Sequence, residues 1–441
     1  MSIRHRALRL LDLLLQGYSG RDLSLWKLFR IFVAMKVIIA IDSLKGCLTS
    51  RQANEAAREA VLQRWPDAEV VCLPMSDGGE GFLDAVEATG SFERVTVPVL
   101  DPLMRPIQAQ YLLSEGRAFI EMAQASGLGL LKPEERNPLR ASSYGTGQLI
   151  ADALRRGAHE IVVGLGGSAT SDCGRWISSP LQPPPAPSQG GGDDFLVSLS
   201  GRSFSSFITP SLGGGRGRFL LATDVTNPLL GEQGAAHTFA RQKAAPGMTP
   251  AELDAMVEEL ESRASAFAAE SAARLGHDCS GEAGAGAAGG VGYALMQYLG
   301  ARRVSGIDFV LDLANFDSHL PDADLIITGE GRADHQTLMG KVPMGILQRA
   351  KAFALDSPQH TSSLHHSITS SLPHSITPSL PHSSAPAVVL LAGQVADREA
   401  LLQAGFAHVV AITPPDMPLS MALQPQVARH NIIETIKHIN L

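Results

Sequence analysis

The sequence predicts an α/β fold with mostly parallel β-sheets. Short apolar runs rich in Val, Ile and Leu recur along the chain, and a glycine-rich or acidic loop and an amphipathic stretch follow them. Apolar runs that alternate with helices are typical of strands buried on both faces of a parallel sheet. The chain has 441 residues, 44% of them hydrophobic and 18% charged, so it is long enough for two domains rather than one.

The predicted strands are the apolar runs themselves. They are VIIAI (37–41), VVCLP (70–74), IVVGL (161–165), DLIITG (324–329), AVVLLAG (387–393) and HVVAIT (408–413). The longest predicted helix begins after Thr249, with Pro250 in its first turn, Glu252 completing a capping box and Gly276 at its end. In open parallel sheets ligands bind beyond the carboxyl ends of the strands. The polar loops after these runs are therefore the expected place of a site.

The net charge and the cysteine content exclude some classes of binding partner and of bound metal for this chain. The net charge of −8 argues against nucleic acid and against an anionic membrane surface, because both require a basic face. Small molecules are the expected partners. The four cysteines lie far apart and form no CxxC pair, which predicts neither a disulfide framework nor a zinc site and suits a reducing cytoplasm. The oligomeric state stays open, a homodimer included.

Three segments interrupt the α/β pattern. Residues 1–34 are basic and leucine-rich, but Asp12 interrupts the apolar run, so we expect an N-terminal extension outside the fold rather than a targeting signal. Residues 175–217 contain PPPAP and two GGG runs and form a divergent segment. Residues 357–386 contain the tandem repeat HSITSSLP and HSITPSLP, which is typical of a low-complexity insert.

Several polar loops carry the residue types that phosphoryl transfer requires. That reaction needs cations and backbone amides around the phosphates, carboxylates for Mg²⁺ and a base for the attacking hydroxyl. The loops are DSLKG (42–46), SDGGEG (76–81), GLGGSATSD (164–172) and GEGRADHQTLMGK (329–341). Each loop alone is more typical of an ordinary surface loop than of a site, but several at strand ends together indicate a site.

The standard nucleotide signatures are missing. The sequence contains no GxxxxGK[ST] loop. GAGAAGG (284–290) satisfies GxGxxG, but no apolar strand precedes it, so close backbone packing or an anion-binding turn is the preferred interpretation.

Nine blocks in order resemble the glycerate kinase family. They are DSLKGCLTS, PMSDGGEG, DPLMRPI, IEMAQASGL, NPLRASSYGTGQLI, GLGGSATSD, ATDVTNPLLG, AGAAGG and ITGEGRADHQT with GKVP. The resemblance covers about Met35 to Thr413 outside the two internal interruptions, and ordered agreement over many blocks is more specific than one motif. It implies ATP- and Mg²⁺-dependent phosphorylation of D-glycerate to 2-phosphoglycerate.

The resemblance also implies the domain organisation. We expect a flavodoxin-like α/β domain formed by residues 35–95 and 285–441, and a second α/β domain formed by residues 96–284. The active site is expected in the cleft between the two domains.

The resemblance assigns expected roles to individual residues. Lys45 is the expected contact to a phosphate or carboxylate, and Asp172 and Asp224 are the candidates for general base. The candidate metal ligands are Asp77, Glu330 and Asp334. The candidate substrate- or nucleotide-binding residues are Asp42, Ser43, Asp77, Gly78, Gly79, Glu80, Ser143, Tyr144, Gly145, Thr146, Gly166, Gly167, Ser168, Asn227, Gly331, Thr337 and Lys341. N-capping of a helix explains the group 142–146 equally well.

The sequence also departs from the family pattern. The family usually continues the serine loop as NDGG and a helix, whereas Ser171 and Cys173 replace two of these positions and unrelated sequence begins at Arg175. FARQKAA (239–245) stands for the more usual FGPQKGA, and His335 stands where glycine is common. Two alternatives follow: a catalytically impaired relative that binds nucleotide or glycerate without turnover, and a kinase for another small hydroxy acid.

Overall fold

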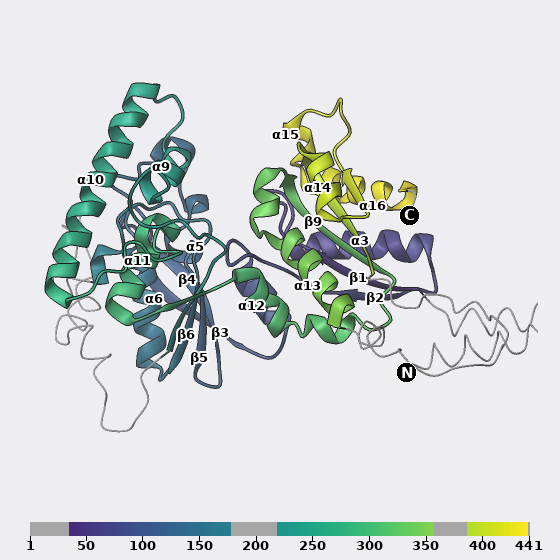
Figure 1. Cartoon of the computed structure of the whole chain (residues 1–441), viewed down its shortest axis with the longest axis horizontal. Helices are drawn as coiled ribbons and strands as arrows, with labels where there is room; N and C mark the ends of the chain where they lie inside the picture. The colour runs from purple at the N-terminus through teal and green to yellow at the C-terminus, as the bar shows by residue number, and fades with distance from the viewer. Residues whose placement is uncertain (1–34, 178–217, 357–385, 440–441) are drawn as a thin grey trace, which may run out of the picture. The chain divides into compact units, whose positions relative to one another are not determined.

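The computed structural model describes residues 35–177, 218–356 and 386–439, which belong to two compact units (Figure 1). Unit 1 consists of Met1–Met75 and Leu311–Leu441, and unit 2 consists of Ser76–Val310. The sequence-based boundaries lie after residues 95 and 284. The predicted extension (1–34), residues 178–217 of the divergent segment and residues 357–385 of the insert lie outside the described residues.

Unit 1 contains a five-stranded sheet in which all neighbouring strands are parallel. Its strands are β1 (Lys36–Ile41), β2 (Glu69–Cys72), β9 (Leu325–Ala333), β10 (Ala387–Val395) and β11 (His408–Ala411). The order β2-β1-β9-β10-β11 is the flavodoxin-like order, in which the direction of winding reverses between β1 and β9. All six predicted apolar runs form strands, five of them here, and the predicted α/β fold with mostly parallel sheets is confirmed.

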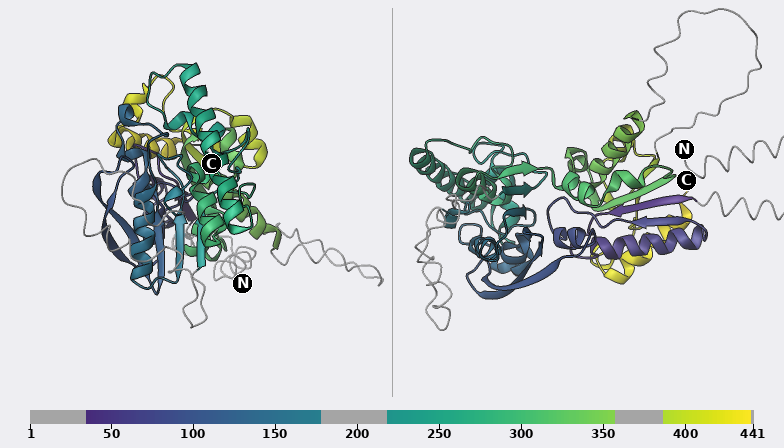
Figure 2. Two further views of the ribbon diagram at one scale, coloured as in Figure 1. Left: turned by 90° about the vertical axis from the view of Figure 1, so that its left-hand side faces the viewer. Right: turned by 90° about the horizontal axis from the view of Figure 1, so that it is seen from below.

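Helices cover both faces of the unit 1 sheet. They are α3 (Ser50–Arg64), α13 (Val342–Asp356), α14 (Arg398–Ala404), α15 (Leu419–Ala422) and α16 (Pro425–His438). In the right-hand view of Figure 2, the green α13 lies on one side of the sheet, and the purple α3 and the yellow α16 lie on the other. Alanines at helical spacing on α3, with Ile432 and Ile436 of α16, join the buried core above Val37 and Ile39.

Unit 2 contains a six-stranded mixed sheet in the order β3-β4-β5-β6-β7-β8. Its strands are β3 (Glu93–Leu100), β4 (Pro106–Ser114), β5 (Arg117–Glu121), β6 (Glu160–Gly164), β7 (Arg218–Ala222) and β8 (Arg302–Val304). The pairs β3–β4 and β4–β5 are antiparallel, and the remaining pairs are parallel. The carboxyl ends of β6 and β7 therefore meet at one edge of the sheet.

The middle strands of the unit 2 sheet, β5 and β6, are buried on both faces, whereas one face of β3 is exposed. Its helices are α4 (Phe82–Glu87), α5 (Ala123–Ser126), α6 (Tyr144–Arg155), α9 (Ala235–Phe239), α10 (Pro250–Leu275), α11 (Ala287–Leu299) and α12 (Gly306–Leu313). Apolar residues of α6, α10 and α11 form one core with alternate residues of β3, including Val95, Val97 and Val99. A separate aromatic cluster joins Phe82, Phe119 and Phe309, with ring centroids 6.2–6.3 Å apart.

The predicted caps of α10 are confirmed. The Thr249 hydroxyl accepts a hydrogen bond from the Glu252 amide at 3.3 Å, and the Glu252 carboxylate accepts one from the Thr249 amide at 2.7 Å. Gly276 ends the helix with φ 75°, a left-handed conformation that glycine adopts without strain.

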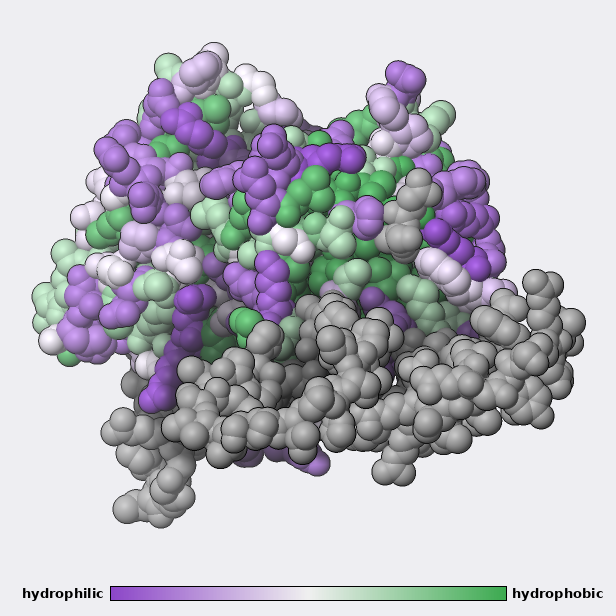
Figure 3. All heavy atoms as spheres, turned by 45° about the vertical axis from the view of Figure 1, so that its right-hand side comes forward, coloured by the Kyte–Doolittle hydropathy of each residue, from purple (hydrophilic) through white to green (hydrophobic). Residues whose placement is uncertain are grey.

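On the face drawn in Figure 3, hydrophilic side chains are spread between smaller hydrophobic areas. Within residues 35–177, 218–356 and 386–439, no helix combines the length and the apolar character needed to cross a bilayer. All four cysteines have free thiols.

The segment GAGAAGG leads into α11 through a left-handed turn. Ala288, Gly289 and Gly290 have φ values of 55°, 66° and 91°. The Cys173 amide donates to the Gly289 carbonyl at 3.1 Å, and a Cβ atom on Gly289 would overlap the Thr170 carbonyl oxygen. The glycines therefore allow this turn to pack closely against the loop that follows β6.

We expect Gly289→Ala to lower the free energy of unfolding by about 2 kcal/mol or more, because the new Cβ combines positive-φ strain with a backbone overlap. Gly281→Ala is the control, since a Cβ there meets nothing within 4 Å. It should change stability by less than about 0.5 kcal/mol. Thermal melting of the full chain compares the two variants, and equal melting temperatures would contradict the packing role of Gly289.

Candidate active site

The predicted site residues fall into two groups, one in each unit. The unit 1 group is Asp42, Ser43, Lys45, Glu330, Gly331, Asp334, Thr337 and Lys341. The unit 2 group is Asp77, Gly78, Gly79, Glu80, Ser143, Tyr144, Gly145, Thr146, Gly166, Gly167, Ser168, Asp172, Asp224 and Asn227. Each group is described within its own unit.

The unit 1 group lies at the carboxyl ends of β1 and β9. The Asp42 amide donates to the Gly329 carbonyl at 2.9 Å, which continues the pairing of the two strands. A Cβ atom on Gly331 would have the Lys45 amide nitrogen, 3.9 Å away, as its nearest neighbour. The strand order reverses between β1 and β9. Ligands of open α/β sheets bind at the carboxyl ends of strands where such a reversal occurs.

Glu330 is the centre of a hydrogen-bond network in unit 1. The Thr337 hydroxyl donates to its carboxylate at 2.6 Å, and the Lys341 ammonium lies 3.7 Å from its other oxygen. The Thr337 hydroxyl in turn accepts from the Asp334 amide at 3.0 Å. Asp334 caps the short helix η6 (His335–Met339) by accepting from the Gln336 amide. The network fixes residues 330–341 and leaves the Lys341 side chain about a third exposed.

Two buried hydroxyl groups near these strand ends have no hydrogen-bond partner. They belong to Ser43, which is 6% exposed, and to Thr328, which is completely buried. Leaving a buried hydroxyl unpaired costs about 1–3 kcal/mol, so such groups are rare outside ligand sites. The Ser43 hydroxyl, next to Asp42 and two residues before Lys45, fits an oxygen-rich ligand.

In unit 2, glycines bring two predicted loops into backbone contact. A Cβ on Gly166 would overlap the Cα of Gly79, and the Gly166 amide donates to the Gly78 carbonyl at 3.0 Å. A Cβ on Gly78 would overlap the carbonyl of Ala222 at the end of β7. Glycine is therefore required where the loops SDGGEG and GLGGSATSD meet.

This contact brings Asp77 close to Asp224. Asp224 follows β7 and accepts hydrogen bonds from the amides of Gly306 and Ile307 at 3.0 and 3.3 Å. Burial raises the pKa of Asp224 to about 6, and the nearby Asp77 carboxylate contributes to the rise. A half-buried carboxylate with this pKa is ionised at neutral pH and basic enough to take a proton from a hydroxyl.

Asp172 has a different environment. Its carboxylate accepts from the Ser143 amide at 2.7 Å, from the Ser143 hydroxyl at 2.8 Å and from the Gly174 amide at 3.2 Å. Burial raises its pKa, while these hydrogen bonds oppose the rise. The anion at the N-terminus of α6 is thus the protein's own Asp172, which joins the loop after β6 to that helix.

The neighbours of Ser143 are also engaged in packing. Thr146 is completely buried, and its hydroxyl lies 2.7 Å from that of Ser126. A Cβ on Gly145 would overlap the Leu100 carbonyl, and the Tyr144 amide donates to the Ser142 hydroxyl at 3.2 Å. These contacts give the segment a packing role, but Ser143 at the N-cap of α6 makes no side-chain capping hydrogen bond, so the capping alternative is not confirmed.

The remaining predicted residues of unit 2 lie at the edges of this group. Asn227 uses its side-chain amide to fix its own loop, donating to the Gln233 carbonyl at 2.8 Å. Glu80 is exposed. Behind its loop, the buried Glu121 accepts from the Leu83 amide at 3.1 Å, and burial raises the pKa of Glu121 to about 7. Glu121 was not predicted, although it ends a strand in the motif IEMAQASGL.

Lys243 is the second residue that sequence reasoning missed. It lies beneath the loop after β6 and donates to the Ser168 hydroxyl at 2.8 Å and to the Thr170 carbonyl at 2.7 Å. The amide groups of Leu128 and Ala169 complete the support by bonding the Gly167 and Ser126 carbonyls. The segment FARQKAA gives no local signal for this burial, because Lys243 directly follows the polar residues Arg241 and Gln242.

The beginning of the divergent segment also supports the site. Residues Arg175–Ile177 form a short 3₁₀ turn rather than the α-helix that the family pattern places here. The Trp176 indole donates to the Ser143 hydroxyl at 2.7 Å, and its ring covers Gly147 so closely that a Cβ there would lie 2.6 Å from it. Trp176 therefore supports the same serine that binds Asp172.

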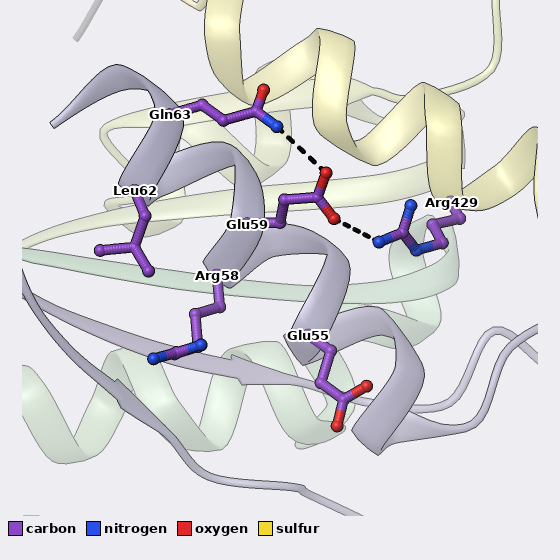
Figure 4. A pocket seen from close by; sticks show the side chains of 6 residues that line it. All are labelled: Glu55, Arg58, Glu59, Leu62, Gln63 and Arg429. Atoms are coloured by element: carbon purple, nitrogen blue, oxygen red, sulfur yellow. Dashed lines mark hydrogen bonds and ion pairs between the residues drawn. The ribbon is translucent and has the colours of Figure 1, made fainter. Parts of the chain in front are cut away.

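Unit 1 also contains a hollow away from the predicted site residues. The hollow is lined by Glu55, Arg58, Glu59, Leu62 and Gln63 of α3 and by Arg429 of α16 (Figure 4). The Glu59 carboxylate is already paired with Gln63 and Arg429, and no predicted site residue lines this hollow. Within the described ranges, no group of three or more His, Cys, Asp or Glu side chains could hold a metal ion.

We expect Trp176→Phe to keep the ring contact and to cost about 1 kcal/mol of stability through loss of the indole hydrogen bond. Trp176→Ala should cost about 3 kcal/mol, because it also empties the space over Gly147. Trp65→Phe in unit 1 is the matched control and should change stability less than Trp176→Ala. Calorimetric melting of the full chain measures all three. A Trp176→Ala variant as stable as the unmodified chain would show that the segment gives no support.

Comparisons with known proteins agree with these motifs. A model of the glycerate kinase family matches residues 37–376. A glycerate kinase of Halalkalibacterium halodurans is 41% identical over 72% of this chain and 83% of its own length. The glycerate 2-kinase of Escherichia coli is 39% identical with the same coverage, and a glycerate kinase of Bacillus subtilis is 34% identical over 88% of this chain and 93% of its own length.

A solved structure gives the same assignment. A crystal structure from Salmonella typhimurium LT2, described as that of a proposed glycerate kinase 2, superposes with a TM-score of 0.63 at 33% identity. The superposition covers 92% of this chain and 96% of the Salmonella chain. With a family model over most of its length and several relatives above 30% identity, the chain belongs to the glycerate kinase family.

Proposed function

We propose that this enzyme phosphorylates D-glycerate to 2-phosphoglycerate, with ATP as phosphate donor and Mg²⁺ as cofactor. Family membership supports the kinase activity and the substrate class. The observation that carries the proposal for this chain is the pair Asp77 and Asp224, held together by glycine-dependent backbone contacts in unit 2. A cytoplasmic location and a homodimeric state stay predictions.

We assign the nucleotide phosphates to the unit 1 group. The unpaired Ser43 hydroxyl and the ammonium groups of Lys45 and Lys341 are the donors and cations that a polyphosphate requires. Glu330 orients Lys341 through the 3.7 Å ion pair. ATP would supply the phosphoryl group, and Mg²⁺ would neutralise its charge.

Candidate Mg²⁺ ligands are present in both units. Mg²⁺ in kinases is commonly held by one or two carboxylates, substrate phosphates and water rather than by a cage of protein side chains. Asp77 of unit 2 and Glu330 and Asp334 of unit 1 are the residues that we assign to it. Among them, Glu330 and Asp334 already accept hydrogen bonds that fix their orientation.

We assign Asp224 as the general base for the acceptor hydroxyl. Its carboxylate is half-buried and held by two amides, so it can accept the proton that the glycerate hydroxyl loses as its oxygen attacks phosphorus. Asp172 is the alternative base. Its oxygens already accept from Ser143 and Gly174, so we assign it to positioning of the loop instead.

We expect Asp224→Asn to lower kcat by about 10²–10⁴-fold, because the amide cannot accept the proton. In the unmodified enzyme, kcat/KM should rise with pH through about 6, as Asp224 loses its proton, and the variant should lose this rise. Coupled measurement of ADP release gives both quantities. Asp416→Asn, a change at an exposed residue between β11 and α15, is the matched control and should leave kcat unchanged.

Three outcomes decide between the alternatives. Turnover of D-glycerate, with NMR showing phosphate on the 2-hydroxyl, would support the proposal. Ligand-induced melting shifts without turnover by the folded protein in Mg²⁺ would identify a catalytically impaired relative, which the departures at Ser171 and Cys173 favour. Faster turnover of a different hydroxy acid in a substrate panel would reassign the substrate.

A further inference from the structure

Lys243 is a buried cation with an unusual position. It ends the short turn Arg241–Lys243, is 4% exposed and places its ammonium between the Ser168 hydroxyl and the Thr170 carbonyl. Burying an ammonium group is costly unless hydrogen bonds and a nearby negative charge compensate. The Asp172 carboxylate and the Cys173 thiol are the titratable groups that act on it, and Asp172 favours its charged form.

The chemistry of an ammonium group determines the role of Ser168. An ammonium nitrogen has only donors, so the Ser168 oxygen must accept the hydrogen bond from Lys243. The hydroxyl hydrogen of Ser168 must then be directed to another group. Within the described ranges, the Ser168 hydroxyl makes no hydrogen bond besides that from Lys243, and Ser168 is 8% exposed. Ser168 is thereby a donor without a protein partner.

The position of this donor indicates its ligand. Ser168 lies two residues after Gly166, whose amide is bonded to the loop that carries Asp77. Asp77 and Asp224 supply only negative charge to this part of unit 2, so the carboxylate of a bound hydroxy acid needs donors from elsewhere. A serine hydroxyl forced to donate is such a group.

We propose that Lys243 is a positioning residue that makes the Ser168 hydroxyl a hydrogen-bond donor to the carboxylate of D-glycerate. The proposal rests on the proposed function for the identity of the substrate. Burial lowers the pKa of Lys243 to about 8, so the group is still mainly an ammonium at neutral pH. Lys243 itself does not contact the substrate.

A purely structural role for Lys243 would give different results. Lys243 also bonds the Thr170 carbonyl, so its loss can loosen the loop without involving Ser168. A double-mutant cycle separates the two roles, because residues that act through one contact give non-additive effects. The variants are Lys243→Met, Ser168→Ala and the double variant, each made in the full chain. Lys437→Met, at a partly exposed lysine of α16, is the matched control.

Each single variant should raise KM for D-glycerate, and the Kd from calorimetry without ATP, by about tenfold, the value of one hydrogen bond to a charged group. The KM and Kd of the double variant should lie within about twofold of the values for Ser168→Ala, because Lys243 acts only through that hydroxyl. Changes in kcat should be smaller than those in KM. The Lys437→Met control should have the same KM, Kd and kcat as the unmodified enzyme.

The proposal is overturned if Lys243→Met leaves KM and Kd unchanged, or if the two single effects multiply to about a hundredfold in the double variant. If Lys243→Met does not fold, the Kd values of Ser168→Thr and Ser168→Ala for D-glycerate test the proposal instead. Threonine keeps the hydroxyl and should retain the Kd better than alanine, and equal Kd values would overturn the proposal. Binding without turnover by the unmodified chain contradicts only the proposed function, whereas absence of D-glycerate binding contradicts both.

Discussion

The hydrogen bonds between Asp172 and Ser143 are the constraint on which the unit 2 site depends. They join the loop after β6 to the first turn of α6, two segments about thirty residues apart in sequence, at 2.7 and 2.8 Å. Trp176 bonds the same serine, and Lys243 and Gly289 bond the same loop from other sides. A loop held by several independent partners is preorganised, which is the main contribution of a protein to phosphoryl transfer.

Glycines allow close backbone contacts between the loops of unit 2. Backbone contacts at Gly78, Gly166 and Gly289 allow loops to approach more closely than any side chain permits, and this places Asp77 near Asp224. In unit 1, the reversal of strand order places Asp42 beside Gly329. Each unit thus carries its own group of candidate site residues: lysines, hydroxyls and the carboxylates Glu330 and Asp334 in unit 1, and the pair Asp77 and Asp224 in unit 2.

The sequence predicted the five strands of unit 1 and β6, because burial on both faces leaves continuous apolar runs. It missed β5, β7 and β8, which also have parallel neighbours. It did not predict β3, whose buried residues alternate with exposed ones and which contains Pro98 at the sheet edge. Motifs predicted candidate site residues, but not the residues that contact them. Nothing local to FARQKAA shows that Lys243 is buried under Ser168, and nothing near Asp172 shows that Ser143 occupies its oxygens. Such pairings depend on tertiary contacts between distant segments.

Amide hydrogen exchange of the full chain tests most directly whether the loop after β6 is held in place. The amides of Ser143, Ala169 and Cys173 are hydrogen-bonded to Asp172, Ser126 and Gly289, respectively. Mass spectrometry should therefore show peptides that cover residues 165–174 exchanging nearly as slowly as β6 itself. Exchange as fast as that of an unprotected loop, in an otherwise protected unit 2, would contradict the account.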